Sequence, residues 1–417
     1  MTAALPRTPQ RTGVFRGWYV VAGVFVVLTV SAGIGFYGLS VYLRALTVEQ
    51  GFSVGAVSAA TAGFFVVGGL VGLPAASWTA RRDARPLVGV GALACAASLL
   101  LLGHLTEAWQ LYAVYALFGA GFSACSLVPG TTLVTRWFAR RRSVALSVAT
   151  TGLSAGGVLL TPLVAAAVER HGLAATSPWL AAAFVVVVVP VGALLLHPSP
   201  QALGLQPDGD PEPPPGTDRT VAGTPAATAV RTRFFVAVTV AHLLAMAAQV
   251  GGMAHVYNLV AERRDAALAA TVLSVLAGSS LVGRLVGGVV AARVSMRLMA
   301  VVLMAAQATS LLLLSLVSSP TGLLLATVLF GVTVGNLLML HPPLLAERFG
   351  VRDYPGIYSR SQLAATVGIA AGPAVAGAMH DALDGYGAAF ALIAAASMLG
   401  AVALSLSGRT RVPRSVS

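Results

Sequence analysis

A single arginine lies inside an otherwise apolar run of the sequence. The stretch "SSLVGRLVGG", residues 279–288, carries Arg284 near its centre, and the next basic residue is Arg293, nine positions later. If the run is a helix that crosses a membrane, Arg284 lies roughly 13 Å inside the end marked by Arg293. A cation at that depth costs about 2.5 to 3.5 kcal/mol on insertion scales, so its presence predicts a specific partner.

The acidic residues of the chain are not expected to supply that partner. All 14 Asp and Glu residues fall in predicted loops or at predicted helix ends. A guanidinium that faces a water-filled path without a protein counter-ion is a binding site for an anion, and its planar fork of donors suits a carboxylate. The competing interpretation is that Arg284 hydrogen-bonds helix carbonyls, water or the hydroxyls of Ser279 and Ser280.

Other polar side chains in apolar runs are candidates to line the same path. The set comprises Tyr37, Tyr257 and Asn336 as binding residues, His255 and His341 as possible proton carriers, and Arg360 as a second basic residue. Imidazole titrates near neutral pH, and no carboxylate is expected inside the membrane, so a histidine could carry a proton. Against these assignments, a lone histidine or tyrosine in such a helix is often a packing residue, and Arg360 could reach the surface.

The composition indicates a polytopic membrane protein. The 417 residues are 57% hydrophobic and only 10% charged, with a mean hydropathy of +0.84. Apolar segments long enough to cross a bilayer recur along the whole chain. The predicted spans are 17–43, 55–79, 86–105, 109–135, 143–168, 178–197, 234–260, 267–292, 298–317, 321–345, 355–379 and 386–407. We therefore expect an all-α integral membrane fold with twelve transmembrane helices.

The spans fall into two groups of six. A segment rich in Pro, Gly and Thr separates them and is expected to be a flexible cytoplasmic linker. The predicted parts are an N-terminal tail (1–16), a first half (17–197), the linker (198–233), a second half (234–408) and a C-terminal tail (409–417).

The two halves repeat each other. "ARRDAR" (Ala80–Arg85) and "ARVSMR" (Ala292–Arg297) are 212 positions apart, and so are Arg136 and Arg348. Paired six-helix repeats around a central path are typical of secondary transporters. The position 212 residues before Arg284 is Gly72, so the charge is present in one half only, as one asymmetric site requires.

The distribution of arginine predicts the topology. All 26 basic residues are arginines, and outside the spans only Arg44, Arg170, Arg263 and Arg264 fall on the predicted outer side. By the positive-inside rule, both termini are cytoplasmic and the protein spans the cell (inner or plasma) membrane. The net charge of +12 therefore reflects topology, and nucleic-acid binding is not expected. The two cysteines lie in apolar spans and predict neither a disulfide nor a metal site.

The organisation resembles the major facilitator superfamily, through its twelve spans, central linker and arginine-containing motif after the second and eighth spans. Four stretches resemble its bacterial monocarboxylate and oxalate/formate branch: "RGWYVV" (Arg16–Val21), "RWFARRRSVALSVATTGLSAGG" (Arg136–Gly157), "ALGLQPDGD" (Ala202–Asp210) and "GRLVGG" (Gly283–Gly288). The resemblance covers nearly the whole chain.

The resemblance implies a role for the buried cation. An arginine in the eighth helix is the carboxylate-binding residue of that branch, and Arg284 matches it. Relatives often carry Asp or Asn one turn earlier, where this chain has Ser280, which could orient the arginine without neutralising it. The oxalate-binding relatives place a second cation deeper in the eleventh helix than Arg360, so a monocarboxylate is favoured over a dicarboxylate.

These observations predict a secondary active transporter of a small organic anion, working as a monomer by proton symport or anion exchange with alternating access. The chain has no lysine, no HExxH or CxxC motif and no GxSxG in a strand-to-helix context, so neither an enzyme nor a cofactor is expected. Two alternatives remain. One is an exporter of amphipathic drugs or a secondary metabolite, which would tolerate loss of Arg284, and the other is a non-transporting membrane sensor.

Overall fold

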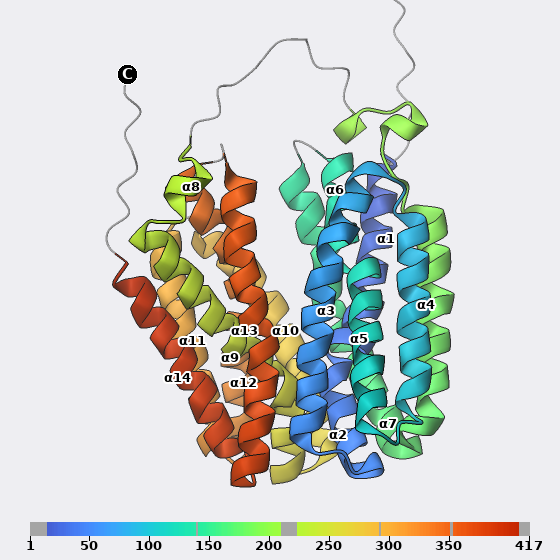
Figure 1. The fold of residues 1–417 in the computed structure, drawn as a ribbon, viewed down its shortest axis with the longest axis vertical. Coiled ribbons are helices and arrows are strands. Elements are labelled where there is room, and N and C mark those ends of the chain that lie inside the picture. Colours follow the sequence, from blue (N-terminus) through green and yellow to red (C-terminus); the bar gives the residue numbers. More distant parts are fainter. Residues whose placement is uncertain (1–14, 139–140, 210–222, 292, 351–352, 408–417) are drawn as a thin grey trace, which may run out of the picture.

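The protein folds into two helical bundles that stand side by side (Figure 1). The computed structural model describes residues 15–138, 141–209, 223–291, 293–350 and 353–407. Within these ranges, 11 helical segments are long and apolar enough to cross a membrane, and one of them contains two spans. The prediction of an all-α membrane fold with twelve spanning helices in two halves is confirmed.

The first half contains six spans. Its elements are α1 (Gly17–Val30), the π-helix η1 (Ser31–Phe36), α2 (Gly38–Gln50), α3 (Val54–Arg81), α4 (Arg85–Leu102), α5 (Ala108–Cys125), α6 (Leu127–Trp137) and α7 (Arg142–Leu195). The predicted fifth and sixth spans are both part of α7, which is interrupted at Gly172, where φ is 77°. Thr176 Oγ1 donates to Ala167 O across this turn (3.1 Å), so the chain reverses direction there.

The first span is longer than predicted. It was expected to end at residue 43, but helix α2 continues to Gln50 and stops at Gly51, whose φ of 74° is the left-handed conformation that ends many helices. The charged residues Arg44 and Glu49 lie on the last turns of this helix, where charged side chains reach the membrane surface.

The second half has the same six-span arrangement. Its elements are α9 (Arg233–Arg263), α10 (Ala266–Ala291), α11 (Met296–Leu316), α12 (Pro320–Phe349), α13 (Tyr354–Leu383) and α14 (Tyr386–Ser405). Three short elements, η2 (Gln201–Leu203), η3 (Pro207–Gly209) and α8 (Ala226–Ala229), lie within the predicted linker. Residues 210–222 of that linker lie outside the described residues.

The two ends of the predicted linker pack on different halves. The backbone N–H of Arg141 donates to Asp208 Oδ1 in η3 (3.3 Å), and that of Ala226 in α8 donates to Asp353 Oδ2 (3.1 Å). We call the end of the molecule that carries η3 and α8 the linker end, and the opposite end, which carries Gly51 and Gly172, the far end (Figure 1). The assignment of the linker end to the cytoplasm remains a prediction.

The sequence repeat reappears as a repeat of helix contacts. A Cβ added to Gly119 in α5 would lie 2.1 Å from Phe64 O in α3, and one added to Gly331 in α12 would lie 2.5 Å from Leu276 O in α10. Both members of the second pair lie 212 positions after those of the first. Glycine therefore allows the same pair of helices to touch backbone to backbone in each half.

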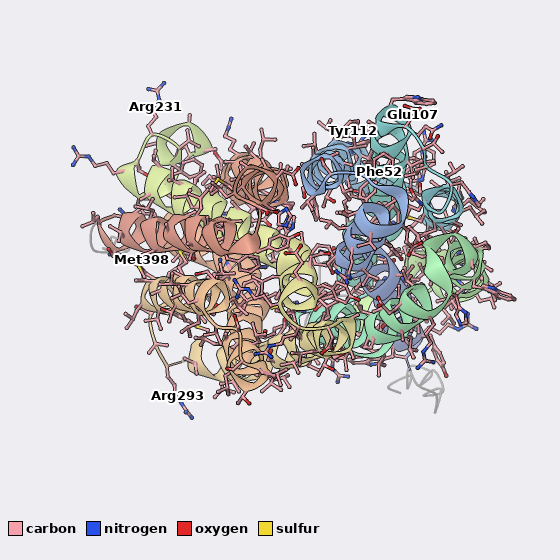
Figure 2. The ribbon with its side chains drawn as sticks, turned by 90° about the horizontal axis from the view of Figure 1, so that it is seen from below. Phe52, Glu107, Tyr112, Arg231, Arg293 and Met398 are labelled. Atoms are coloured by element: carbon pink, nitrogen blue, oxygen red, sulfur yellow. The ribbon has the colours of Figure 1, made fainter. Side chains whose placement is uncertain are left out.

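The halves are joined at the far end. Asp381 Oδ2 in α13 accepts the backbone N–H of Gly55 in α3 (2.7 Å), and Asn258 Nδ2 in α9 donates to Ser40 O in α2 (3.1 Å). From this end the ribbons of the two halves diverge towards the linker end (Figure 1). Seen from the far end, Phe52 and Glu107 lie on one bundle and Met398 on the other (Figure 2).

The π-helix η1 interrupts the first span just before Tyr37. Two side chains bond carbonyls of this segment: Tyr42 Oη donates to Ile34 O (2.8 Å) and Thr161 Oγ1 donates to Gly33 O (3.2 Å). A π-turn contains one residue more than an α-turn, so every side chain that follows is rotated about the helix axis. The segment thereby sets the direction in which Tyr37 points.

Candidate functional site

Arg284 lies where the two halves meet. Its helix, α10, packs against α12 of its own half and against α7 of the first half. Nη1 donates to Thr150 O on α7 over 3.4 Å, at the long limit for a hydrogen bond. A Cβ added to Gly335 on α12 would lie 3.0 Å from Arg284 Cγ, so this glycine leaves room for the arginine stem.

The guanidinium of Arg284 is incompletely satisfied. Its Nε is buried and has no hydrogen-bond partner, whereas the side chain as a whole is only half-buried. Carboxylates of the described chain pair with other groups at the ends of helices, as Asp83 does with Arg85 and as Glu262 and Asp381 do with His380. No carboxylate of the described chain pairs with Arg284. The site can therefore accept an anion.

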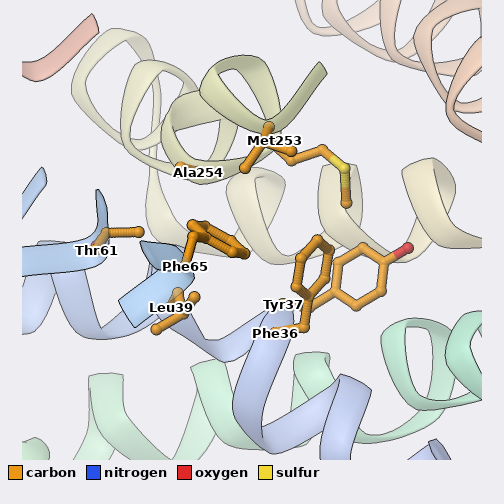
Figure 3. A pocket seen from close by; sticks show the side chains of 8 residues that line it. Phe36, Tyr37, Leu39, Thr61, Phe65, Met253 and Ala254 are labelled. Carbon is orange, nitrogen blue, oxygen red and sulfur yellow. The ribbon is translucent and has the colours of Figure 1, made fainter. Parts of the chain in front are cut away.

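Tyr37 is the predicted binding residue that interacts electrostatically with Arg284. It is 6% exposed, and its hydroxyl lies within electrostatic range of the guanidinium. A cavity about the size of one water molecule adjoins it, lined from the first half by Phe36 and Phe65 and from the second by Met253 (Figure 3). The surroundings of Tyr37 are thus apolar, apart from the arginine itself.

Two other predicted binding residues do not face the arginine head group. Asn336 Nδ2 donates to Gly283 O (2.8 Å) and to Val332 O (2.9 Å), so this amide joins α12 to α10. Ser280 is fully buried, and its Oγ has no hydrogen-bond partner, so it does not orient Arg284 in this structure. We assign neither residue to the site.

Tyr257 and Arg360 are also separate from Arg284. Tyr257 lines a far-end pocket together with Arg44, Glu49 and Glu169. Arg360 is exposed near the linker end, where its Nη1 donates to Gly356 O over 3.3 Å. The structure gives neither of them a contact with the candidate site.

The two candidate proton carriers differ in their surroundings. His255 is fully buried and has partners on both ring nitrogens: Nε2 contacts Ser58 Oγ (3.3 Å) and Pro373 O (3.1 Å), and Nδ1 contacts Tyr386 Oη (3.3 Å). His341 instead stacks on His242, with ring centroids 3.9 Å apart. Sequence reasoning missed His242, although it lies within an apolar span, nine residues after the start of α9.

No metal-binding cluster accompanies the site. Across the described ranges, no three His, Cys, Asp or Glu side chains gather closely enough to hold an ion. The available chemistry is electrostatic recognition by a guanidinium beside apolar walls.

The sequence model of the Major Facilitator Superfamily matches residues 25–340 and 256–417, which together span most of the chain. The chain belongs to the major facilitator superfamily. It is therefore a multi-pass membrane transporter of that superfamily, as the paired bundles indicate.

Individual proteins are similar to this chain in sequence or in fold. The chain is 28% identical over 326 residues to monocarboxylate transporter 13 of Bos taurus, covering 76% of this chain and 72% of the relative. It is similar in fold to a mutant of the nucleoside transporter NupG, with a TM-score of 0.69, 13% identity and coverage of 95% of this chain and 100% of that one. A bacterial homologue of the human lysosomal transporter Spinster, inward-facing and occupied, gives a TM-score of 0.62, 13% identity and coverage of 94% of both chains.

Proposed function

We propose that this major facilitator superfamily transporter carries a small organic anion, a monocarboxylate, and that Arg284 binds its carboxylate. The observation that carries the proposal is the half-buried guanidinium of Arg284 at the contact between the halves, whose Nε has no hydrogen-bond partner and which no described carboxylate neutralises. A carboxylate would accept two N–H donors of that fork, which no described carboxylate of the chain does. The similarity to monocarboxylate transporter 13 supports the same class of substrate.

The position of Arg284 also suggests how binding and movement are linked. The arginine belongs to the second half, whereas Thr150 O, which accepts its hydrogen bond, belongs to the first. A bound carboxylate would take over the donor now given to that carbonyl and so weaken a contact between the halves. Alternating access, driven by proton symport or anion exchange across the cell membrane, would then follow from rocking one half against the other.

An exporter of amphipathic compounds is the second candidate function. The apolar walls formed by Phe36, Phe65 and Met253 favour it, because they would suit an apolar substrate body. In that function the guanidinium would be dispensable. The same variant therefore distinguishes the two proposals.

Uptake by the purified protein in liposomes tests the role of Arg284. With labelled lactate, pyruvate or formate inside or outside, we expect Arg284→Gln to lower transport by a factor of about 100 or more, because the charge-assisted pair contributes about 1.5 to 3 kcal/mol per bond. Arg284→Lys should recover part of the activity, since it keeps the charge but loses the fork.

The matched control is Arg360→Gln, which removes an exposed arginine of the same half. It should transport at close to the wild-type rate, because Arg360 lies outside the site. Unchanged monocarboxylate transport by Arg284→Gln would refute the proposal. Amphipathic export that persists in that variant would instead establish the second candidate.

A further inference from the structure

Two buried histidines of the second half stack on each other. His242 of α9 and His341 of α12 have ring centroids 3.9 Å apart and ring planes inclined by 9°, and each residue is 3% exposed. Nε2 of His242 and Nδ1 of His341 are buried without a hydrogen-bond partner. A cavity about the size of one water molecule lies against both rings.

The groups that face this pair carry no fixed charge among the described residues. Helix α13 contributes Ser361 and the ring of Tyr358, whose centroid lies 5.5 Å from that of His341. Helix α11 contributes Ala300 and Met304, and helix α14 contributes Leu404. The two imidazoles are therefore the basic side chains of this cluster, and an imidazole can bind or release one proton.

A chain of hydroxyls connects the pair to a less buried position. His341 Nε2 contacts Ser361 Oγ (2.8 Å), and Ser361 Oγ contacts Thr239 Oγ1 (2.8 Å). Ser361 is fully buried, whereas Thr239 is half-buried. Thr239 lies six residues after the start of α9, near the linker end. A hydroxyl both donates and accepts, so a proton can pass along this chain by rotation of the O–H groups.

We propose that His242 and His341 form a single-proton site whose occupancy is linked to anion binding at Arg284; the linkage rests on the proposed function. The proton is taken up from water on one side of the membrane and released to water on the other as the halves rock, with the hydroxyl chain as its route at the linker end, and no covalent bond to carbon changes. One imidazolium is stabilised by the face of the neutral ring stacked on it. A second proton is disfavoured, because two like charges would then lie 3.9 Å apart.

Helix α12 provides the physical link between the two sites. Gly335 on this helix packs against the stem of Arg284, and His341 lies six residues further along. His341 is followed by Pro342 and Pro343 inside the helix, which lack the N–H groups that would bond the preceding turn. The helix bends most easily at these prolines. A change of charge on His341 can therefore change the bend, and with it the position of Gly335 relative to Arg284.

Two transport measurements on the full chain in liposomes test the linkage. One is accumulation of labelled lactate driven by a proton gradient, and the other is exchange of labelled for unlabelled lactate at equal pH. We expect His242→Asn and His341→Asn to lose accumulation by about tenfold or more but to keep exchange within about twofold, because exchange needs no net proton transfer. His104→Asn, on the far-end loop after α4, is the matched control.

The inference is overturned if both variants still accumulate lactate, or if wild-type protein exchanges lactate without responding to the gradient. Failure of the proposed function looks different: wild-type protein would exchange no monocarboxylate, or Arg284→Gln would still do so. If the asparagine variants do not fold, His242→Phe preserves a stacked aromatic face and removes both nitrogens.

Nitrogen NMR of labelled histidine in lipid nanodiscs tests the proton site without transport. The signals assigned by His242→Phe and His341→Asn should shift together in one titration that corresponds to one proton per pair. Two rings that stay neutral over the whole range, or that titrate independently, would contradict the single-proton site. This measurement decides the site even if lactate is not the substrate.

Discussion

Arginine serves two chemically different purposes in this transporter. Several arginines at the helix ends donate to main-chain carbonyls: Arg85 Nε to Leu196 O (3.3 Å), Arg263 Nη2 to Ser315 O (2.8 Å) and Arg297 Nε to Leu404 O (3.2 Å). These carbonyls lie at or just beyond the C-terminal ends of helices, where the backbone lacks donors and the helix dipole is negative. Arg284 differs, because its own donors are not used up in this way.

His197, beside Arg85, makes the C-terminal end of α7 sensitive to acid. Arg85 Nη2 donates to His197 Nδ1, which can accept only while the ring is neutral. Partial burial, and then the charges of Arg85 and Arg16, lower the pKa of His197 from its ordinary value. As the pH falls below about 6.5, the unfolded chain takes up a proton that the folded chain refuses, so stability falls until the lower folded pKa is passed.

We therefore expect His197→Gln to reduce the loss of thermal stability between neutral and mildly acidic pH. The measurement is the apparent Tm of the protein in nanodiscs at about pH 7.5 and about pH 5. His104→Gln, on an exposed loop, serves as the control and should behave like wild-type protein. An equal drop in Tm for wild type and His197→Gln would show that His197 carries none of the acid sensitivity.

At the scale of helices, glycine determines how closely the spans of each half approach. A Cβ at Gly119 or Gly331 would meet a backbone oxygen, and at Gly331 the Ser279 side chain as well, so no side-chain rotation alone can relieve the clash. We expect Gly119→Ala and Gly331→Ala each to destabilise the protein by about 1 to 3 kcal/mol, the usual cost of overpacking. Apparent Tm of the purified variants is the measurement.

The controls for this prediction come from neighbouring helices. A Cβ at Gly63 in α3 or at Gly288 in α10 would meet nothing within 4 Å. Gly63→Ala and Gly288→Ala should therefore leave Tm unchanged or raise it slightly, since alanine is favoured over glycine in a helix by up to about 1 kcal/mol. A Tm loss as large in these controls would mean that the backbone contacts are not the cause.

The helix pattern was predictable because local signals carry it. Apolar length gave the spans, and the offset of 212 positions between motifs is the same offset that separates the glycine contacts. Pairings between distant spans were not predictable. His242 stacks on His341, and the Asn336 amide joins two helices, because of how each helix is rotated about its axis. That rotation cannot be read from apolar segments that contain no charged residues.

At the scale of the whole molecule, the contact of Asp381 with helix α3 holds the far end closed. Its carboxylate accepts the N–H of Gly55, in the first turn of that helix, where the helix dipole favours a negative charge. The acid and the helix belong to different halves. The halves can separate at this end only if the contact breaks.

We expect Asp381→Asn to shift the protein towards a state that is separated at the far end. Loss of a charge at a helix N-terminus costs about 0.3 to 1 kcal/mol, so the separated population should rise by a factor of about two to five. The exposed residues Val48 and Leu383, one in each half, can be replaced by cysteine and spin-labelled. Double electron–electron resonance would then report the separated state as a longer distance between the two labels.

Asp384→Asn is the matched control for this prediction. Asp384 ends α13 in a left-handed conformation (φ 50°), which asparagine adopts equally well. This control should leave the distance distribution unchanged. If Asp381→Asn also leaves it unchanged, the carboxylate does not determine closure.

The extra residue in the π-turn of η1 rotates the following part of the first span about its axis, relative to where a regular α-helix would place it. Each residue turns an α-helix by about 100°, so shortening this segment by one would carry Tyr37 roughly a quarter of a turn away from Arg284 while α1 kept its place against α7. The side chains of Tyr42 and Thr161 donate hydrogen bonds to carbonyls of η1, in addition to the backbone hydrogen bonds of the helix. The part of this span at the far end can thus rotate independently of the part at the linker end. The two ends of the span can then move at different steps of the transport cycle.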